Sequence, residues 1–354
     1  MEKLEAAFAE SLGVQGAVAT GYGRGALWLA LQLVIGDRPG AEVLVPDFIC
    51  AQVPEAVRRA GGRASFFPVQ RDLTVREQDL EAAITRDTRA VVLAHYYGRG
   101  LTNIGRLAAL CRRRSIVVIE DCALALGARV QGRLVGRFGD LAVFSFTKSD
   151  WCYGGGVLTT PVRDWASRLR QLRAEKCRPA PRLAFCYGLL RRADFAANSP
   201  GRSRIAGWAG RWLERGLSLL EPTLRGNFFD AGRFDAAMPE LAARRALHIL
   251  MHLDATIARR HAVQASRAAE LLDRVCAIRP GGLAELRLDP DLGETGAFLL
   301  LQANDGPPEG WLDLADHVGH ALRLSWPAYQ RAEPAETSPE LKWLRDHLLI
   351  AEMT

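Results

Sequence analysis

The residues of this chain best suited to chemistry are an aspartate and a lysine that each follow an apolar segment. Asp121 ends the run VVIED, and Lys148 follows Ser145 in the segment FGDLAVFSFTKSDWCYGGG at 138–156. A carboxylate at the carboxyl end of a buried parallel strand points into the crevice where α/β sheets bind ligands. A lysine held at a neighbouring strand end is suited to forming a covalent imine with a carbonyl compound. A helix-capping aspartate and a solvated loop lysine are the alternatives for each residue taken alone.

A glycine-rich turn, GYGRGAL at 21–27, begins an apolar helical segment. Backbone N–H groups at the start of a helix bind anions, and a phosphate suits them best. A dinucleotide-binding turn is disfavoured, because no acidic residue follows at the strand position that this pattern requires. An ordinary N-terminal turn is the remaining alternative.

Lysine is rare in this chain, which makes the position of Lys148 informative. Of the 46 basic residues only four are lysines, namely Lys3, Lys148, Lys176 and Lys342. The glycine triplet that follows Lys148 closes its loop, and the nearest other lysine is Lys176. We therefore expect Lys148 to be the covalent anchor of any carbonyl-bearing cofactor.

Short apolar strands alternate with helices in the first half of the chain. A strand, the glycine-rich turn and a helix occupy 16–36, and the other segments are strands at 43–48, 63–69, 89–98, 115–122 and 140–146 and helices at 53–62, 79–88 and 104–114. Alternation of this kind predicts parallel βαβ units with strands buried on both faces.

From residue 163 the pattern changes to helical stretches, including a long helix at 240–275 and weaker strands at 297–304 and 321–327. We predict a large α/β domain over 1–230, with a basic helical insertion at 178–230. A smaller α+β domain follows over 231–354.

The composition excludes several classes of protein. With 49% hydrophobic and 24% charged residues, the 354-residue chain is neither disordered nor fibrous. No apolar run reaches the roughly 18 residues of a membrane span. The acidic amphipathic start at 1–13 is not a signal peptide, so a cytoplasmic protein is expected. The seven cysteines show no CxxC spacing, and neither a disulfide framework nor a metal site is predicted.

The net charge of +6 is concentrated in one segment. Residues 181–220 contain seven arginines against Asp194 and Glu214. No nucleic-acid-binding motif accompanies them. A surface insertion is the plain interpretation, while a lid, a membrane-surface contact at 204–220 or a grip on a phosphorylated substrate are alternatives.

Taken together, these motifs resemble one family. The stretches GRGALWLAL, EVLVPDFICAQVPEAVRRAG, LEAAITRDTRAVVLAHYYG, VVIEDCALALGA and GRFGDLAVFSFTK, the last followed by GGGVLTT, are similar to those of the DegT/DnrJ/EryC1/StrS family of sugar aminotransferases. The resemblance implies fold type I, in which helices flank a mainly parallel sheet. It also implies the cofactor pyridoxal 5′-phosphate (PLP), a homodimer, and transfer of an amino group from glutamate to a nucleotide-linked keto-sugar or a related biosynthetic ketone.

The resemblance leaves two alternatives. One is a PLP enzyme of different chemistry, such as a dehydratase or a carbon–carbon bond-forming enzyme of a secondary-metabolite pathway. The family's dehydratases lack the imine-forming lysine, so the presence of Lys148 argues against a dehydratase. The other alternative is a non-catalytic PLP-binding or regulatory protein.

The family's roles carry over to five residues of this chain. Asp121 would hold the cofactor's pyridine nitrogen in its protonated form, and Lys148 would form the covalent link and move the proton. Ser145 and the backbone amides of Gly23 and Arg24 would bind the phosphate.

Several positions depart from the family pattern. Leu124 stands where members commonly have a glutamine that bonds the ring hydroxyl, and Arg24 replaces a threonine of the phosphate turn. Cys50 replaces an aromatic residue that stacks on the ring, which leaves Phe48 or His95 to cover that face.

A further departure concerns the partner subunit. The family's Asn-Tyr-Arg, which reaches in from the partner, aligns with Asp235, Ala236 and Ala237. We therefore expect Arg225 or Arg233 to cross the interface instead, with Asp235 as a third candidate.

Overall fold

The computed structural model describes residues 1–36, 38–148, 154–179, 234–262, 283–285, 298–303, 322–324 and 338–352. The basic segment at 181–220, Arg225 and Arg233 lie outside the described residues. The predictions made for them therefore stay predictions.

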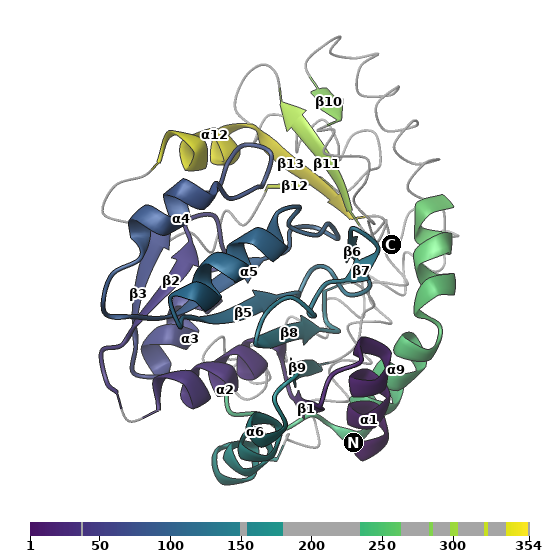
Figure 1. The fold of residues 1–354 in the computed structure, drawn as a ribbon. Coiled ribbons are helices and arrows are strands. Elements are labelled where there is room, and N and C mark those ends of the chain that lie inside the picture. Colours follow the sequence, from purple (N-terminus) through teal and green to yellow (C-terminus); the bar gives the residue numbers. More distant parts are fainter. Residues whose placement is uncertain are drawn as a thin grey trace, which may run out of the picture.

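A seven-stranded sheet forms the centre of the molecule (Figure 1). Its strands run in the order β1-β9-β8-β5-β4-β2-β3. Their bounds are Gly16–Thr20 (β1), Glu42–Pro46 (β2), Arg63–Phe67 (β3), Thr88–Ala94 (β4), Val117–Asp121 (β5), Leu141–Ser145 (β8) and Gly156–Thr160 (β9). β2, β3, β4, β5 and β8 are parallel, and β9 is antiparallel to both of its neighbours. This arrangement confirms the predicted α/β class.

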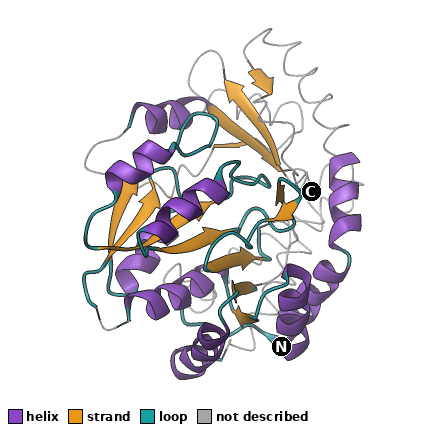
Figure 2. Ribbon diagram, viewed as in Figure 1, coloured by secondary structure: helices purple, strands orange, loops and turns teal. Residues whose placement is uncertain are grey.

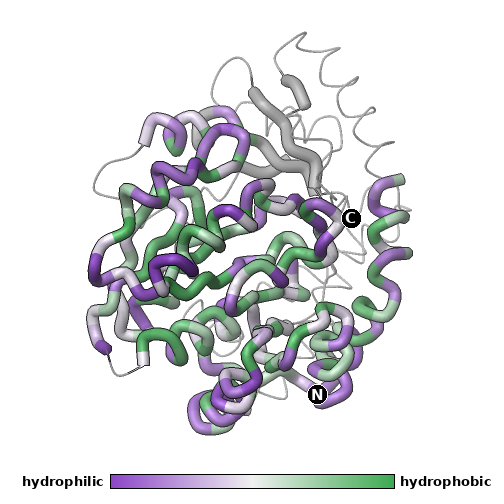
Figure 3. Tube along the Cα trace, in the orientation of Figure 1, coloured by the Kyte–Doolittle hydropathy of each residue, from purple (hydrophilic) through white to green (hydrophobic). Residues whose placement is uncertain are grey.

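Helices surround this sheet, as Figure 2 shows. They are α1 (Glu2–Leu12), α2 (Gly23–Ile35), α3 (Gln52–Arg59), α4 (Glu77–Ala83), α5 (Ile104–Arg113), α6 (Arg163–Lys176) and α9 (Glu240–Met251). Every residue of β1, β2, β8 and β9 is buried, and hydrophobic residues follow the strands in Figure 3. Burial of both sheet faces explains why the strands are apolar runs without alternation.

Two predicted elements end earlier than the apolar pattern indicated. The strand predicted at 89–98 ends at Ala94, because Tyr97 and Gly98 adopt positive φ angles of 50° and 83° and turn the chain. The helix predicted at 240–275 is interrupted at His252, and residues 253–262 are helical again. The strand β9 and the hairpin β6 (Arg129–Val130) and β7 (Arg133–Leu134) were not predicted.

A second, four-stranded sheet is built from the C-terminal part of the chain. Its order is β10-β11-β13-β12, with bounds Leu283–Glu285, Phe298–Ala303, Leu348–Glu352 and Leu322–Leu324 in that order. The helix α12 (Pro339–His347) precedes β13. The Ser338 hydroxyl accepts the Leu341 N–H at the start of α12 and donates to Asp47 Oδ2 at 2.7 Å. This bond attaches the segment to the loop after β2, while the domain boundary near 230 stays a prediction.

None of the helices in the described ranges is long and apolar enough to cross a membrane.

Candidate active site

A cavity of about 290 Å³ lies where β4, β5 and β8 end, beside the start of α2. Of the residues predicted for the site, seven line it: Gly23, Arg24, Cys50, His95, Asp121, Ser145 and Lys148. The carboxyl ends of parallel strands share one edge of a sheet, so residues more than fifty positions apart in the chain meet here. The remaining lining residues are Tyr22, Leu27, Ile49, Gln52, Val53, Ala94, Tyr96, Ala123, Leu124, Val143 and Thr147.

Asp121 is the carboxylate of this cavity. Its Oδ1 accepts the Ala123 N–H at 3.0 Å, which fixes the orientation of the side chain. Burial raises the pKa of Asp121 above its usual value of 3.8, and the Ala123 amide and the Lys148 ammonium partly oppose this shift. Desolvation therefore disfavours the carboxylate until a cation joins it, so the residue is suited to a positively charged ligand group.

Lys148 lies three residues after the end of β8, and the glycine triplet at 154–156 leads into β9. Gly154 and Gly155 adopt φ angles of 129° and 115°, which side chains rarely permit. The Gly155 N–H donates to Gly21 O at 2.6 Å, while its carbonyl accepts the Phe146 N–H at 2.9 Å. A Cβ on Gly156 would lie 2.3 Å from Tyr22 O. The triplet thus packs directly against the glycine-rich turn. A residue with a side chain would be strained at any of its three positions.

The start of α2 has the features of an anion-binding helix terminus. Its N-cap residue, Tyr22, makes no side-chain cap hydrogen bond, so the first backbone N–H groups of the helix are not capped by that residue. Gly23 allows close approach to β8, since a Cβ there would lie 3.0 Å from Ser145 Cβ. The hydroxyls of Ser145 and Thr147 are 2.9 Å apart, and the Arg24 guanidinium lies 4.4 Å from the Tyr22 ring centre. Amides, hydroxyls and a guanidinium together suit a phosphate.

Phe48 does not line the cavity, contrary to the prediction that it could cover one face of a bound ring. Its side chain is fully buried in the core, and its carbonyl accepts the Tyr96 hydroxyl at 2.7 Å. Cys50 and Leu124 line the cavity at the positions where the family pattern has an aromatic residue and a glutamine. Burial raises the pKa of the Cys50 thiol, although the Lys148 charge opposes the shift.

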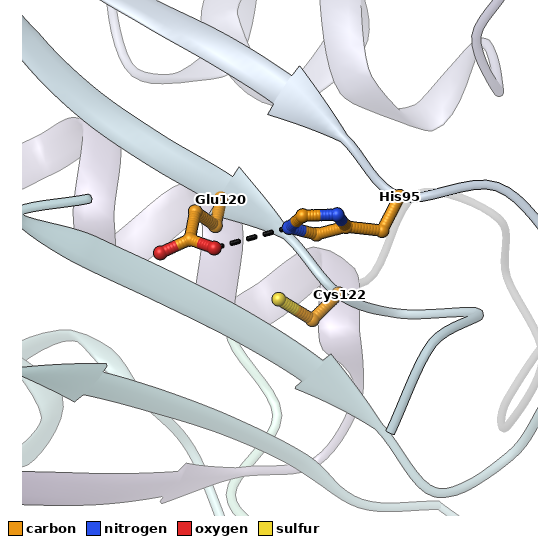
Figure 4. A group of neighbouring side chains, drawn as sticks. All are labelled: His95, Glu120 and Cys122. Atoms are coloured by element: carbon orange, nitrogen blue, oxygen red, sulfur yellow. Dashed lines mark hydrogen bonds and ion pairs between the residues drawn. The ribbon is translucent and has the colours of Figure 1, made fainter. Parts of the chain in front are cut away.

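His95, Glu120 and Cys122 form a buried group whose ligand atoms lie within 4.8 Å of one another (Figure 4). Glu120 accepts the backbone N–H groups of Gly136 at 2.8 Å and of Phe138 and Gly139 at 2.6 Å each. Its Oε2 lies 3.0 Å from His95 Nε2.

The other ring nitrogen of His95, Nδ1, also has a hydrogen-bond partner. Because His95 Nδ1 accepts the Leu101 N–H at 2.9 Å, its Nε2 carries the proton and donates to Glu120. Burial raises the pKa of Cys122 well above its usual value, so this thiol stays protonated. The group therefore holds the loop at 136–139 against β5, and a metal ion would have to displace these bonds.

Thr147 and Gln52 are among the lining residues that the sequence did not lead us to predict. Thr147 stands two positions after Ser145, and this spacing in an extended chain places both side chains on one side. That signal was present in the sequence. Gln52 begins α3, and nothing in its spacing indicated that it would face the cavity.

Asp235 lies beside the glycine-rich turn of its own chain. Its carboxylate pairs with Arg178 at 3.2 Å, and the neighbouring Ala236 carbonyl accepts the Gly21 N–H at 2.7 Å. A contact between Asp235 and the cavity of a partner subunit stays a prediction.

The residues of the cavity fit pyridoxal 5′-phosphate. The close approach that Gly23 permits leaves an uncapped helix start for the phosphate, and a desolvated carboxylate lies on the neighbouring strand for the pyridine nitrogen. Lys148 supplies an amine that lines the same cavity as the helix start and the carboxylate.

Comparisons with known proteins agree with this fit. A model of the DegT/DnrJ/EryC1/StrS aminotransferase family matches residues 1–185. The chain is 35% identical over 268 residues to UDP-N-acetyl-3-dehydro-alpha-D-glucosamine 3-aminotransferase of Acidithiobacillus ferrooxidans, covering 71% of each chain. It is 32% identical over 254 residues to dTDP-3-amino-3,4,6-trideoxy-alpha-D-glucose transaminase of Micromonospora megalomicea, covering 70% of this chain and 64% of that protein.

A solved structure shares the fold over nearly the whole chain. S. venezuelae DesV, in complex with a ketimine intermediate, superposes with a TM-score of 0.69 at 26% identity and covers 99% of this chain and 83% of that one. These similarities confirm the predicted fold class and the predicted aminotransferase. The chain belongs to the DegT/DnrJ/EryC1/StrS aminotransferase family.

Proposed function

We propose that this protein is a PLP-dependent aminotransferase that moves an amino group from glutamate to the keto group of a nucleotide-linked sugar. The observation that carries the proposal is the shared cavity of Asp121 and Lys148 beside the uncapped start of α2. The named relatives support the substrate class, since one name specifies a UDP-linked 3-dehydro sugar and the other a dTDP-linked 3-amino sugar.

Each side chain has a role set by the part of the cofactor or substrate that it would contact. Asp121 keeps the pyridine nitrogen protonated through a charge-assisted bond. The α2 amides, with Ser145 and Thr147, hold the phosphate and so fix the ring in the cavity. Lys148 Nζ would anchor the cofactor, and its freed amine would carry the proton from the amino-bearing carbon of the substrate to the C4′ carbon of the cofactor. When bound, PLP supplies the electron sink that stabilises the carbanion left by this proton.

A spectroscopic experiment tests the assignment. The purified protein should show an absorbance band of bound PLP that glutamate bleaches, and borohydride should fix the cofactor on the peptide containing Lys148. Lys148→Ala should remove this label, whereas Lys176→Ala, on the last turn of α6, should keep it. Label on Lys176, or a band that no amino donor alters, would contradict the proposal. The second result would favour a non-catalytic PLP-binding protein.

We also propose that the active protein is a homodimer in which Arg225 or Arg233 reaches the partner's cavity. The basis is the family pattern, together with the absence of its Asn and Arg at Asp235 and Ala237. Mixing Lys148→Ala chains with Arg233→Ala chains should restore activity if each cavity needs both residues. A fully active monomer in light scattering would refute this. The cytoplasmic location stays a prediction.

A further inference from the structure

The side chain of Gln52 has an unused hydrogen-bonding group. Its Oε1 is shielded from solvent and has no hydrogen-bond partner among the described residues. An unpaired acceptor of this kind is unfavourable, and most buried carboxamides have partners. An unpaired one beside a ligand cavity therefore suggests that the ligand supplies the missing partner.

The position of Gln52 connects it to the reacting centre. It begins α3, two residues after Cys50, and its backbone N–H is directed at the Cys50 thiol, where it partly opposes the rise in pKa that burial causes. It lines the same cavity as Asp121 and Lys148. A hydrogen bond from Gln52 would therefore act close to the ring that these two residues hold.

Other neutral polar groups of the cavity already have partners. Ser145 and Thr147 bond each other, and the Tyr96 hydroxyl donates to the carbonyl of Phe48. Both ring nitrogens of His95 are occupied by Glu120 and Leu101. Leu124, also in the lining, is apolar. Among these side chains, only Gln52 has a buried polar atom with no hydrogen-bond partner in the described part of the chain.

We propose that Gln52 hydrogen-bonds a hydroxyl oxygen carried on the ring of the molecule in the cavity. This inference rests on the proposed function, and two sources share the chemistry: the ring hydroxyl of PLP and a hydroxyl of the sugar. A carboxamide both donates and accepts, which matches a hydroxyl in either protonation state. Rotating it into the cavity breaks no hydrogen bond of Oε1 and adds no charge beside Asp121 and Lys148.

Two variants test the proposal against a matched control. Gln52→Leu keeps the size but removes both hydrogen-bonding atoms, and Gln52→Ala serves if the leucine disturbs packing. Gln171→Leu is the control, because that amide bonds the exposed Glu175 on α6. The cofactor-free proteins are titrated with PLP and with 3-deoxy-PLP, and the KM of the keto-sugar is measured separately.

The outcomes distinguish the two sources. If Gln52 holds the cofactor, the Kd of PLP rises about three- to tenfold in both variants, and the difference vanishes with 3-deoxy-PLP. If it holds the sugar, the Kd of PLP is unchanged and the KM of the sugar rises by a similar factor. The proposal is overturned if neither constant changes more than twofold relative to the control. Wild-type protein that binds no PLP would overturn the proposed function together with this inference.

Discussion

Replacing Asp121 by asparagine should have opposite effects on the cofactor-free protein and on cofactor binding. The carboxylate is buried, so ionising it costs solvation energy, and its pKa is raised for that reason. Asparagine is nearly isosteric, its Oδ1 can still accept the Ala123 N–H, and it has no charge to desolvate. At neutral pH the cofactor-free Asp121→Asn protein should therefore be at least as stable as the wild type.

The pH dependence follows from the same shift. A carboxyl group whose folded-state pKa is raised binds its proton more tightly when folded, so stability is greatest below that pKa and falls as pH rises through it. The wild type should show this loss between the usual Asp value of 3.8 and the raised value, and the variant should lack it. The stability difference should vanish at lower pH.

Cofactor binding should respond in the other direction. The bond between Asp121 and the pyridinium is charge-assisted and contributes about 1.5–3 kcal/mol, which corresponds to roughly a ten- to 150-fold increase in the Kd of PLP when it is lost. Tryptophan fluorescence during PLP titration measures this constant, and urea unfolding of the cofactor-free protein measures the stability. Equal Kd values for the two proteins would refute the placement of Asp121 against the pyridine nitrogen, and a less stable cofactor-free variant would refute the cost of ionising the buried carboxylate.

Three other substitutions test the scaffold of the cavity. Gly156→Ala should destabilise the protein by about 1–3 kcal/mol and weaken PLP binding, since its Cβ meets the backbone of Tyr22, whereas Gly105→Ala, whose Cβ would make only an ordinary van der Waals contact with Phe138 at 3.9 Å, should not. Glu120→Ala should cost about 3–5 kcal/mol in urea unfolding, because three amides and an imidazole lose their acceptor. Ser338→Ala should cost about 1 kcal/mol at neutral pH and less in acid, where Asp47 is protonated and no longer needs the hydroxyl.

The site could be predicted from the sequence wherever a residue ended an apolar strand. Asp121 ends β5 and Ser145 ends β8, and the carboxyl ends of parallel strands must meet at one edge of the sheet. Their contact therefore follows from strand order alone. Lys148, three residues beyond Ser145, remains within reach of the same edge.

Residues in the loops were less predictable. Phe48 follows β2 outside any repeating pattern, and its side chain packs into the core although its neighbour Cys50 lines the cavity. The interruption at His252 has no glycine or proline to announce it. The sequence gives no signal for Gln52, because the lack of a hydrogen-bond partner for its Oε1 depends on which side chains surround it in the folded protein.

The glycine triplet explains how the two ends of the cavity keep their spacing. Gly155 donates to Gly21 and accepts from Phe146, and Gly156 lies against Tyr22, so one short segment contacts both the helix start and the strand that leads to Lys148. A cofactor held by its phosphate at α2 and covalently at Lys148 requires these two points to stay at a constant distance. The backbone contacts provide that constraint without any side chain entering the cavity. The rest of the lining, which includes Cys50, Gln52 and Leu124, takes no part in these backbone contacts and is left to face the bound molecule.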